Sequence, residues 1–138
     1  RNANANATSG VTGVDLTGKD IAPDGGPANV GRVVYFDFDS YVVKADAQGL
    51  IDGNARFLNA GANRKVVVEG HTDERGGREY NLALGQKRAE AVRRSLNLLG
   101  VQDSQVEAVS FGKEKPAAEG ANEAAYSQNR RAELSYRR

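Results

Sequence analysis

The fold is constrained most by a short apolar segment that leads through a glycine-bounded loop into a long amphipathic helix. Residues 65–69 carry three consecutive valines, which is typical of a buried strand. The loop that follows, Gly70–Gly76, reads GHTDERG, and its first glycine lets the chain turn as it leaves the sheet. Small and apolar residues then recur every three or four positions up to Leu99, which predicts a helix of about five turns that ends at Gly100. Loops held in this way often carry function.

Strand and helix patterns on both sides extend this unit. Val33–Phe38 is almost entirely β-branched or aromatic, so we expect a strand with both faces covered. Helical spacing over 44–60 predicts an amphipathic helix, and further patterns predict a strand at 106–111, a helical turn at 123–127 and a strand at 130–136. The order indicates an α/β (α+β) two-layer sandwich, with a mixed four-stranded sheet and two main helices on one face.

The N-terminal stretch has a different composition. Residues 1–30 are rich in Asn, Ala, Gly, Thr and Asp and contain few large apolar side chains, which predicts a flexible tether ahead of a folded domain at 31–138. An alternative is that the few apolar residues of this stretch dock locally.

Charge and cysteine content limit the functional classes. The chain has 138 residues, a net charge of +1 and 27% charged residues, so it carries no strong field that would attract nucleic acid. It contains no cysteine and a single histidine, His71, which is a poor basis for a zinc site. We expect no cofactor and no metal. The sequence lacks an apolar run of the roughly 18 residues that cross a bilayer, so any membrane link requires an anchor absent from this chain.

Two charged residues on neighbouring segments suit one ligand. Asp73 lies in the loop after the valine strand, and Arg88 lies on the following helix, where its side chain can lean back toward that loop. One acid and one cation match a zwitterionic, amino-acid-like group. The alternatives are that Asp73 caps the loop or helix and that Arg88 is an ordinary surface charge.

Five ordered segments resemble the OmpA-like peptidoglycan-binding domain: VVYFDFDS, GHTDERG, YNLALGQKRAEAV, FGKEKP and AAYSQNRRAEL. The resemblance covers residues 31–136 and is greatest to the family's lipid-anchored members of Gram-negative outer membranes. It implies a βαβαβ-type sandwich that binds the meso-diaminopimelate of the peptidoglycan stem peptide without cleaving it. It also implies a place on the periplasmic face of the outer membrane, an N-terminal lipid anchor and a TolB-like partner in the Tol system.

The resemblance assigns Asp73 to the amine of diaminopimelate and Arg88 to its carboxylate. Further ligand-binding positions are carried over from the family: Phe36, Asp37, Phe38, Asp39 and Ser40 in the loop that lines the pocket, Gly70, His71 and Thr72 in the loop that aims Asp73, Leu84 at an apolar wall, and Asn129 and Arg130 at the edge. Backbone N–H groups of the first loop are expected to help hold the carboxylate. The chain departs from its relatives at Gly77 and Arg78.

Two other functions remain open. A wall hydrolase would need an acid–base pair, for which Asp73 with Glu74 or Asp37 with Asp39 are candidates. The lack of a cysteine nucleophile and of a Ser-His-Asp arrangement around the single histidine argues against an enzyme. The other alternative is an adaptor whose main ligand is a protein such as TolB, with a secondary contact to the wall.

Overall fold

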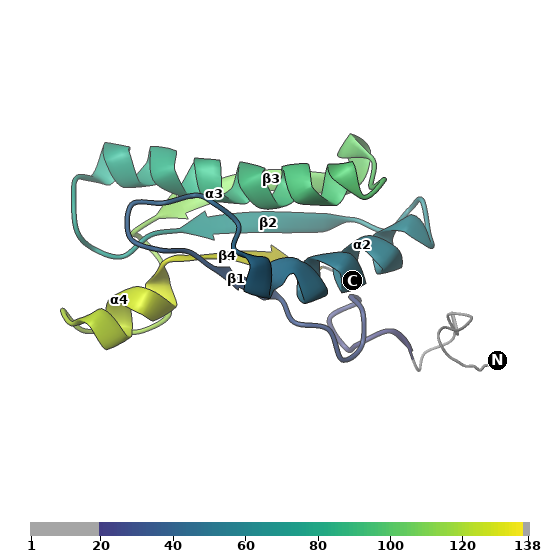
Figure 1. The fold of residues 1–138 in the computed structure, drawn as a ribbon, viewed down its shortest axis with the longest axis horizontal. Coiled ribbons are helices and arrows are strands. Elements are labelled where there is room, and N and C mark those ends of the chain that lie inside the picture. Colours follow the sequence, from purple (N-terminus) through teal and green to yellow (C-terminus); the bar gives the residue numbers. More distant parts are fainter. Residues whose placement is uncertain (1–19, 137–138) are drawn as a thin grey trace.

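The computed structural model describes residues 20–136, and its centre is a mixed four-stranded sheet (Figure 1). The strands are β1 (Val33–Tyr35), β2 (Val66–His71), β3 (Val106–Gly112) and β4 (Arg131–Ser135), in the spatial order β1-β4-β2-β3. β4 pairs antiparallel with β1 and β2, and β2 pairs parallel with β3. The predicted mixed sheet is therefore confirmed.

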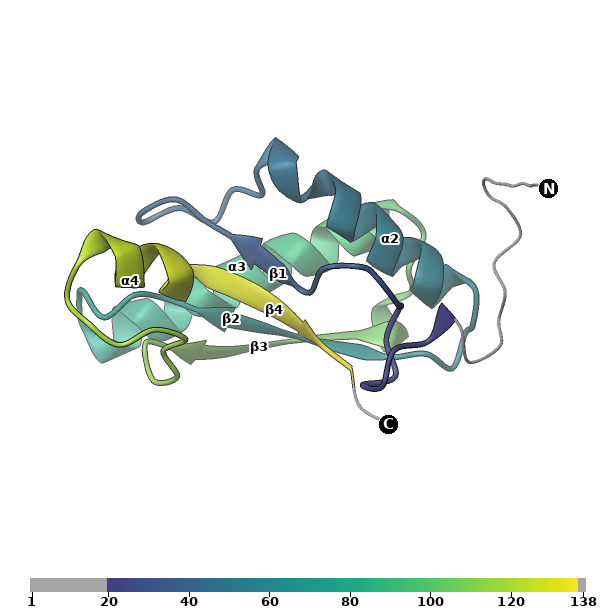
Figure 2. The same cartoon turned by 90° about the horizontal axis from the view of Figure 1, so that it is seen from below.

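The helices lie between the strands in the predicted order. They are α2 (Gln48–Asn59), which follows a 3₁₀ turn at Ala45–Ala47, α3 (Arg78–Leu98) and the short α4 (Glu123–Asn129), with a second 3₁₀ turn at Asp103–Gln105 before β3. α3 runs along β2 and β3, and α2 lies beside it (Figure 2). Among the described residues, none of the helices is long and apolar enough to cross a membrane.

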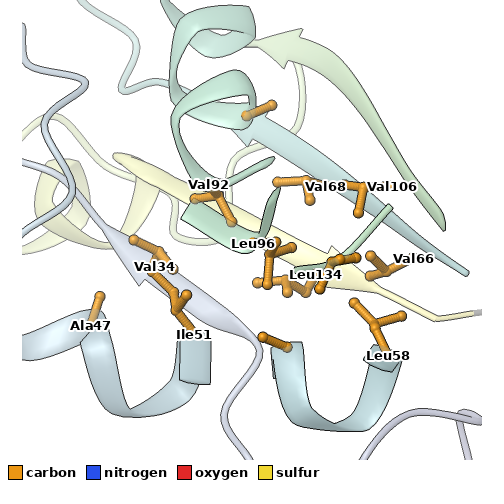
Figure 3. Packing of buried hydrophobic residues seen from close by; sticks show 14 of the residues in the cluster. Val34, Ala47, Ile51, Leu58, Val66, Val68, Val92, Leu96, Val106 and Leu134 are labelled. Atoms are coloured by element: carbon orange, nitrogen blue, oxygen red, sulfur yellow. The ribbon is translucent and has the colours of Figure 1, made fainter. Parts of the chain in front are cut away.

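The core lies between the sheet and the two long helices (Figure 3). Val68 of β2 pairs with Leu134 of β4, and both side chains are buried. Ile51 of α2 and Leu96 of α3 are fully buried in the same cluster, so both helices cover the same face of the sheet. Burial of each such side chain is worth about 1.5–3 kcal/mol, and the two-layer packing follows from this apolar pattern.

The first strand is shorter than predicted, and only one of its faces is covered. β1 ends at Tyr35, and the Asp39 φ of 51° turns the chain away from the sheet. Val34 and Phe36 point into the core, but Tyr35 is 47% and Phe38 is 61% exposed. The apolar residues of this segment therefore form one face that is buried in the core and one aromatic face that is exposed. The prediction that both faces are covered is wrong.

Residues 20–30, predicted as the end of the flexible tether, form an ordered turn on the domain. Asp24 makes an ion pair of 3.0 Å with Arg32, whose guanidinium carbon lies 5.1 Å from the centre of the Tyr136 ring. A Cβ at Gly26 would lie 2.4 Å from that ring, so the turn packs closely against it. The rest of the predicted tether lies outside the described residues.

A glycine contact brings α3 down onto β2. A Cβ built at Gly70 would lie 1.7 Å from the carbonyl oxygen of Gly85, so the strand and the helix touch through their backbones. This contact places the end of β2 under the first half of α3. The loop after β1, the β2–α3 loop and α4 gather at the same end of the molecule (Figures 1 and 2).

His71, the last residue of β2, is buried at the same end. Its ring stacks on Phe111 with 5.5 Å between the centroids, and neither ring nitrogen has a hydrogen-bond partner among the described residues. Burial, assisted by the positive charge of Arg131, lowers the pKa of His71 to about 4. The side chain therefore acts as a neutral packing group at neutral pH.

We predict that Gly70→Ala lowers the free energy of unfolding by about 2–3 kcal/mol, because the added methyl group forces α3 away from β2. Thermal and urea unfolding measure the loss. Gly49→Ala is the matched control, since a Cβ at this α2 position meets nothing within 4 Å, and it should be neutral or slightly stabilising. Equal stability of the Gly70 variant and the wild type would show that the helix and strand do not touch in this way.

We predict that His71 makes the fold sensitive to acid. Below the ordinary histidine pKa of 6.5, the unfolded chain binds a proton that the folded chain excludes until about pH 4, so the free energy of unfolding falls by on the order of 3 kcal/mol across this window. His71→Phe should remove this component without loss of a hydrogen bond. Urea titrations of both proteins at several pH values measure it. An NMR titration that gives His71 a pKa near 6.5 would contradict the prediction.

Candidate functional site

A cavity of about 280 Å³ opens where the loop after β1 meets the β2–α3 loop. It combines apolar side chains with two acids and two cations, and it is lined by Phe38, Asp39, Thr72, Asp73, Arg75, Gly76, Tyr80, Asn81, Leu84 and Arg88. Its walls therefore come from one strand exit, one loop and the first half of α3.

Arg88 connects these walls from beneath the cavity. Its side chain donates three hydrogen bonds to backbone carbonyls: Nε to Ser40 at 2.8 Å, Nη1 to His71 at 2.9 Å and Nη2 to Asp37 at 3.2 Å. The residue is only 1% exposed. Burial lowers the pKa of Arg88 to about 10, opposed by the nearby charge of Asp73, so the guanidinium stays positive at neutral pH.

Asp73 supplies the acid of the cavity and is held by Arg75. Its Oδ1 accepts hydrogen bonds from the Arg75 backbone N–H at 3.0 Å and Nε at 3.2 Å, and its Oδ2 accepts one from Nη2 at 2.7 Å. Nη1 of Arg130 lies 3.7 Å from the same Oδ2. Burial raises the pKa of Asp73, but the bonds and charge of Arg75 outweigh this, and the net pKa lies below its ordinary value.

Arg75 itself contacts two aromatic rings. Its guanidinium carbon lies 4.3 Å from the centre of the Phe38 ring and 4.3 Å from the centre of the Tyr126 ring. The backbone carbonyl of Arg75 accepts a hydrogen bond of 2.9 Å from the Asn81 side chain, which ties the loop to α3. The loop is thus held to α3 and α4 as well as to the strand.

The structure brings six of the predicted site residues together around the cavity: Phe38, Asp39, Thr72, Asp73, Leu84 and Arg88. Asp39 meets the hydroxyl of Tyr80 in a hydrogen bond at the mouth. The apposition of Asp73 and Arg88, inferred from their positions in the sequence, is present in the fold.

Other predicted residues shape the cavity through backbone atoms or packing. Asp37 and Ser40 contribute the carbonyls that hold Arg88, while the Asp37 carboxylate turns outward to Lys44 at 3.0 Å. The N–H of Ser40 donates to the Asp37 carbonyl at 3.2 Å, so this amide is already bonded within the loop. Phe36 belongs to the core, and its N–H donates to the carbonyl of Arg130.

The remaining predicted residues also lie outside the cavity lining. Asn129 holds a loop, since its side-chain oxygen accepts the backbone N–H groups of Ala117 and Ala118. Arg130 braces α4, with Nη2 2.8 Å from Glu123. Gly70 and His71 belong to β2: Gly70 contacts Gly85 of α3, and the ring of His71 stacks on Phe111. These residues position the site without facing it.

Four cavity residues were absent from the predicted set: Arg75, Gly76, Tyr80 and Asn81. All four lie in two of the five segments that carry the resemblance, GHTDERG and YNLALGQKRAEAV. The recurrence of small and apolar residues every three or four positions predicted the apolar stripe of α3. It gave no signal for Tyr80 and Asn81, which lie in the first turn of this helix and face the cavity. Among the described residues, His, Cys, Asp and Glu form no group of three or more that could hold a metal ion.

Known proteins resemble this chain in sequence. The chain matches the OmpA family model over residues 35–130. It is 57% identical over 105 residues to the peptidoglycan-associated lipoprotein of Pasteurella multocida (strain Pm70), across 76% of this chain and 70% of that protein. The protein of the same name from Pseudomonas aeruginosa is 53% identical over 100 residues, across 72% of this chain and 59% of that protein.

Solved structures agree with the sequence matches. The crystal structure of the peptidoglycan-associated lipoprotein from Burkholderia pseudomallei has 60% sequence identity and a TM-score of 0.76, and the match covers 77% of this chain and 90% of that chain. The C-terminal domain of Helicobacter pylori MotB, at 22% identity and a TM-score of 0.69 over 76% of this chain and 82% of that one, shares the fold alone. On the family match and these identities, the chain belongs to the OmpA family.

Proposed function

We propose that this chain is a non-catalytic peptidoglycan-binding domain that links the outer membrane to the cell wall. Membership of the OmpA family and high identity to proteins named peptidoglycan-associated lipoproteins support this role. The proposal places the domain on the periplasmic face of a Gram-negative outer membrane, attached through an N-terminal lipid and working within the Tol system. Its ligand is the meso-diaminopimelate of the stem peptide.

The pairing of Arg88 and Asp73 in one cavity carries the proposal. The free end of diaminopimelate bears an ammonium and a carboxylate on one carbon, and opposite charges in one small cavity match this pair. Repeated stem peptides on the polymer add avidity, so firm attachment does not require a tight single site.

Arg88 can serve the fold and the ligand together. A guanidinium has five N–H donors, and three of those on Arg88 bond to carbonyls. The remaining donors are available to a ligand carboxylate. Lysine has the amine but lacks this carboxylate, so a lysine-type peptide would leave them without an acceptor, and the domain should discriminate against it.

The acids of the site fit binding better than hydrolysis. A general acid needs a raised pKa, but the pKa of Asp73 is lowered by Arg75. Asp37 forms an ion pair with Lys44 and does not line the cavity, whereas Asp39 does. The lowered pKa of Asp73 and the ion pair of Asp37 therefore favour binding over hydrolysis by either carboxylate pair.

We predict that Asp73→Asn lowers binding to diaminopimelate-type peptidoglycan at least tenfold, because the amide cannot pair with the ammonium. Sedimentation with purified wall measures it, and lysine-type wall should bind the wild type weakly. Glu79→Gln is the matched control, since Glu79 is exposed and lies outside the cavity lining.

Arg88→Lys complements this test. It keeps the charge but loses the three-carbonyl brace, so weaker binding should come with altered NMR signals in the loop after β1. Equal binding of both wall types, or unchanged binding by Asp73→Asn, would refute the assigned site. Release of soluble muropeptides by the wild type would instead support a hydrolase.

A second proposal is a protein contact, in keeping with a TolB-like partner. Tyr41 and Val42 are 48% and 67% exposed, and they border a groove of about 640 Å³ along α3, beside Lys87 and Arg94. Exposed apolar side chains of this kind, rimmed by charges, are typical of interaction sites. This groove and the cavity share no lining residue.

We predict that Val42→Glu weakens binding to TolB at least tenfold while wall binding stays unchanged, because it places a charge in an apolar contact. Titration calorimetry with purified TolB and wall sedimentation provide the two readouts. Tight TolB binding by the variant would exclude this groove. Loss of both activities would show that the two surfaces overlap.

A further inference from the structure

The side chain of Arg75 occupies a small cation-binding cage. The cage consists of the Asp73 carboxylate and the rings of Phe38 and Tyr126. The carboxylate accepts a hydrogen bond of 2.7 Å from Nη2, and the centre of each ring lies 4.3 Å from the guanidinium carbon. A carboxylate combined with aromatic faces is a general arrangement for recognising ammonium groups. The same atoms that hold Arg75 would therefore hold the amine of a ligand.

The acceptor positions of Asp73 are largely used by Arg75. A carboxylate offers about four lone-pair sites. Arg75 fills three of them through its backbone N–H, Nε and Nη2. A ligand ammonium that pairs with Asp73 must therefore compete with the Arg75 guanidinium for the same oxygens.

Arg75 is the member of this ion pair that can move aside. Its side chain is 39% exposed, whereas that of Asp73 is 6% exposed. A long side chain at the surface can exchange its partner for water, but a short buried one is fixed by its backbone. The Arg75 side chain can therefore leave the cage without any change in the position of Asp73.

We propose that Phe38, Asp73 and Tyr126 form an ammonium subsite at the edge of the cavity and that Arg75 is an internal occupant which the ligand's ammonium displaces. Tyr126 contacts Arg75 and is not among the lining residues while Arg75 fills the cage. This inference rests on the proposed function and adds Tyr126, on α4, as a ligand contact. A ligand without an ammonium leaves Arg75 in the cage. A ligand with an ammonium but no adjacent carboxylate would bind in the cage, but it would offer no acceptor to the remaining N–H donors of Arg88. The two charges of the zwitterion are therefore recognised by separate groups.

Titration calorimetry with a soluble diaminopimelate-type muropeptide tests the proposal. Arg75→Gln should bind roughly two- to fivefold more tightly than the wild type, the range expected when one partly exposed ion pair no longer competes. Arg78→Gln is the matched control: it removes the same charge nearby, but Arg78 is 67% exposed, pairs with Glu114 and lies outside the cavity lining, so the affinity should not change.

Tyr126 variants in the Arg75→Gln background test the cage itself. Tyr126→Phe keeps the ring and should keep the gain in affinity, whereas Tyr126→Leu removes the aromatic face and should lose it. In the wild type, the Nε–H signal of Arg75 should move on saturation with the muropeptide, as the side chain leaves the two rings.

The outcomes separate this proposal from the proposed function. If the wild type binds the muropeptide and Arg75→Gln binds it equally or more weakly, Arg75 is not a competitor and the inference is overturned. A weaker variant would make Arg75 a ligand contact. An Arg75 signal that stays in place on saturation would also overturn it. If the folded wild type and Asp73→Asn both fail to bind, the proposed function fails, and the inference fails with it.

Discussion

The arrangement at this end of the molecule depends on one buried guanidinium. Arg88 reaches from α3 to the carbonyls of Asp37, Ser40 and His71, and so joins the loop after β1 and the end of β2 to the helix above them. Three carbonyl dipoles stabilise a charge that has almost no contact with water, and no single one of them would suffice. The brace lets a loop of irregular backbone form a wall of the cavity.

The apolar pattern predicted the layers of the fold because burial against a single face follows residue spacing. Val66 and Val68 of β2 lie in the core, together with Ala89, Val92 and Leu96 from the stripe of α3. The same pattern could not show that Tyr35 and Phe38 are exposed, since an aromatic residue has the same strand preference on either face. Nor did composition reveal the ordered turn at 20–30, which is held by an ion pair and a contact with one ring.

The site was predictable to the extent that charge and spacing define it. Asp73 and Arg88 were identified from their residue types and positions, and the fold places both at one cavity. Arg75 was missed because an arginine in a polar loop has no periodic signature, and its importance comes from two rings distant in sequence. Tyr126 contributes one of those rings from α4, which only the three-dimensional structure brings near the loop.

The position of the turn at 20–30 has a mechanical consequence. The turn at 20–30 lies at one end of the domain, and the loops that line the cavity lie at the other (Figures 1 and 2). β1 runs between these ends and pairs antiparallel with β4. In the proposed role, a pull between an N-terminal anchor and a ligand in the cavity would therefore be directed along the strands. The ladder hydrogen bonds would be loaded in shear, all together, rather than opened one after another like a zipper.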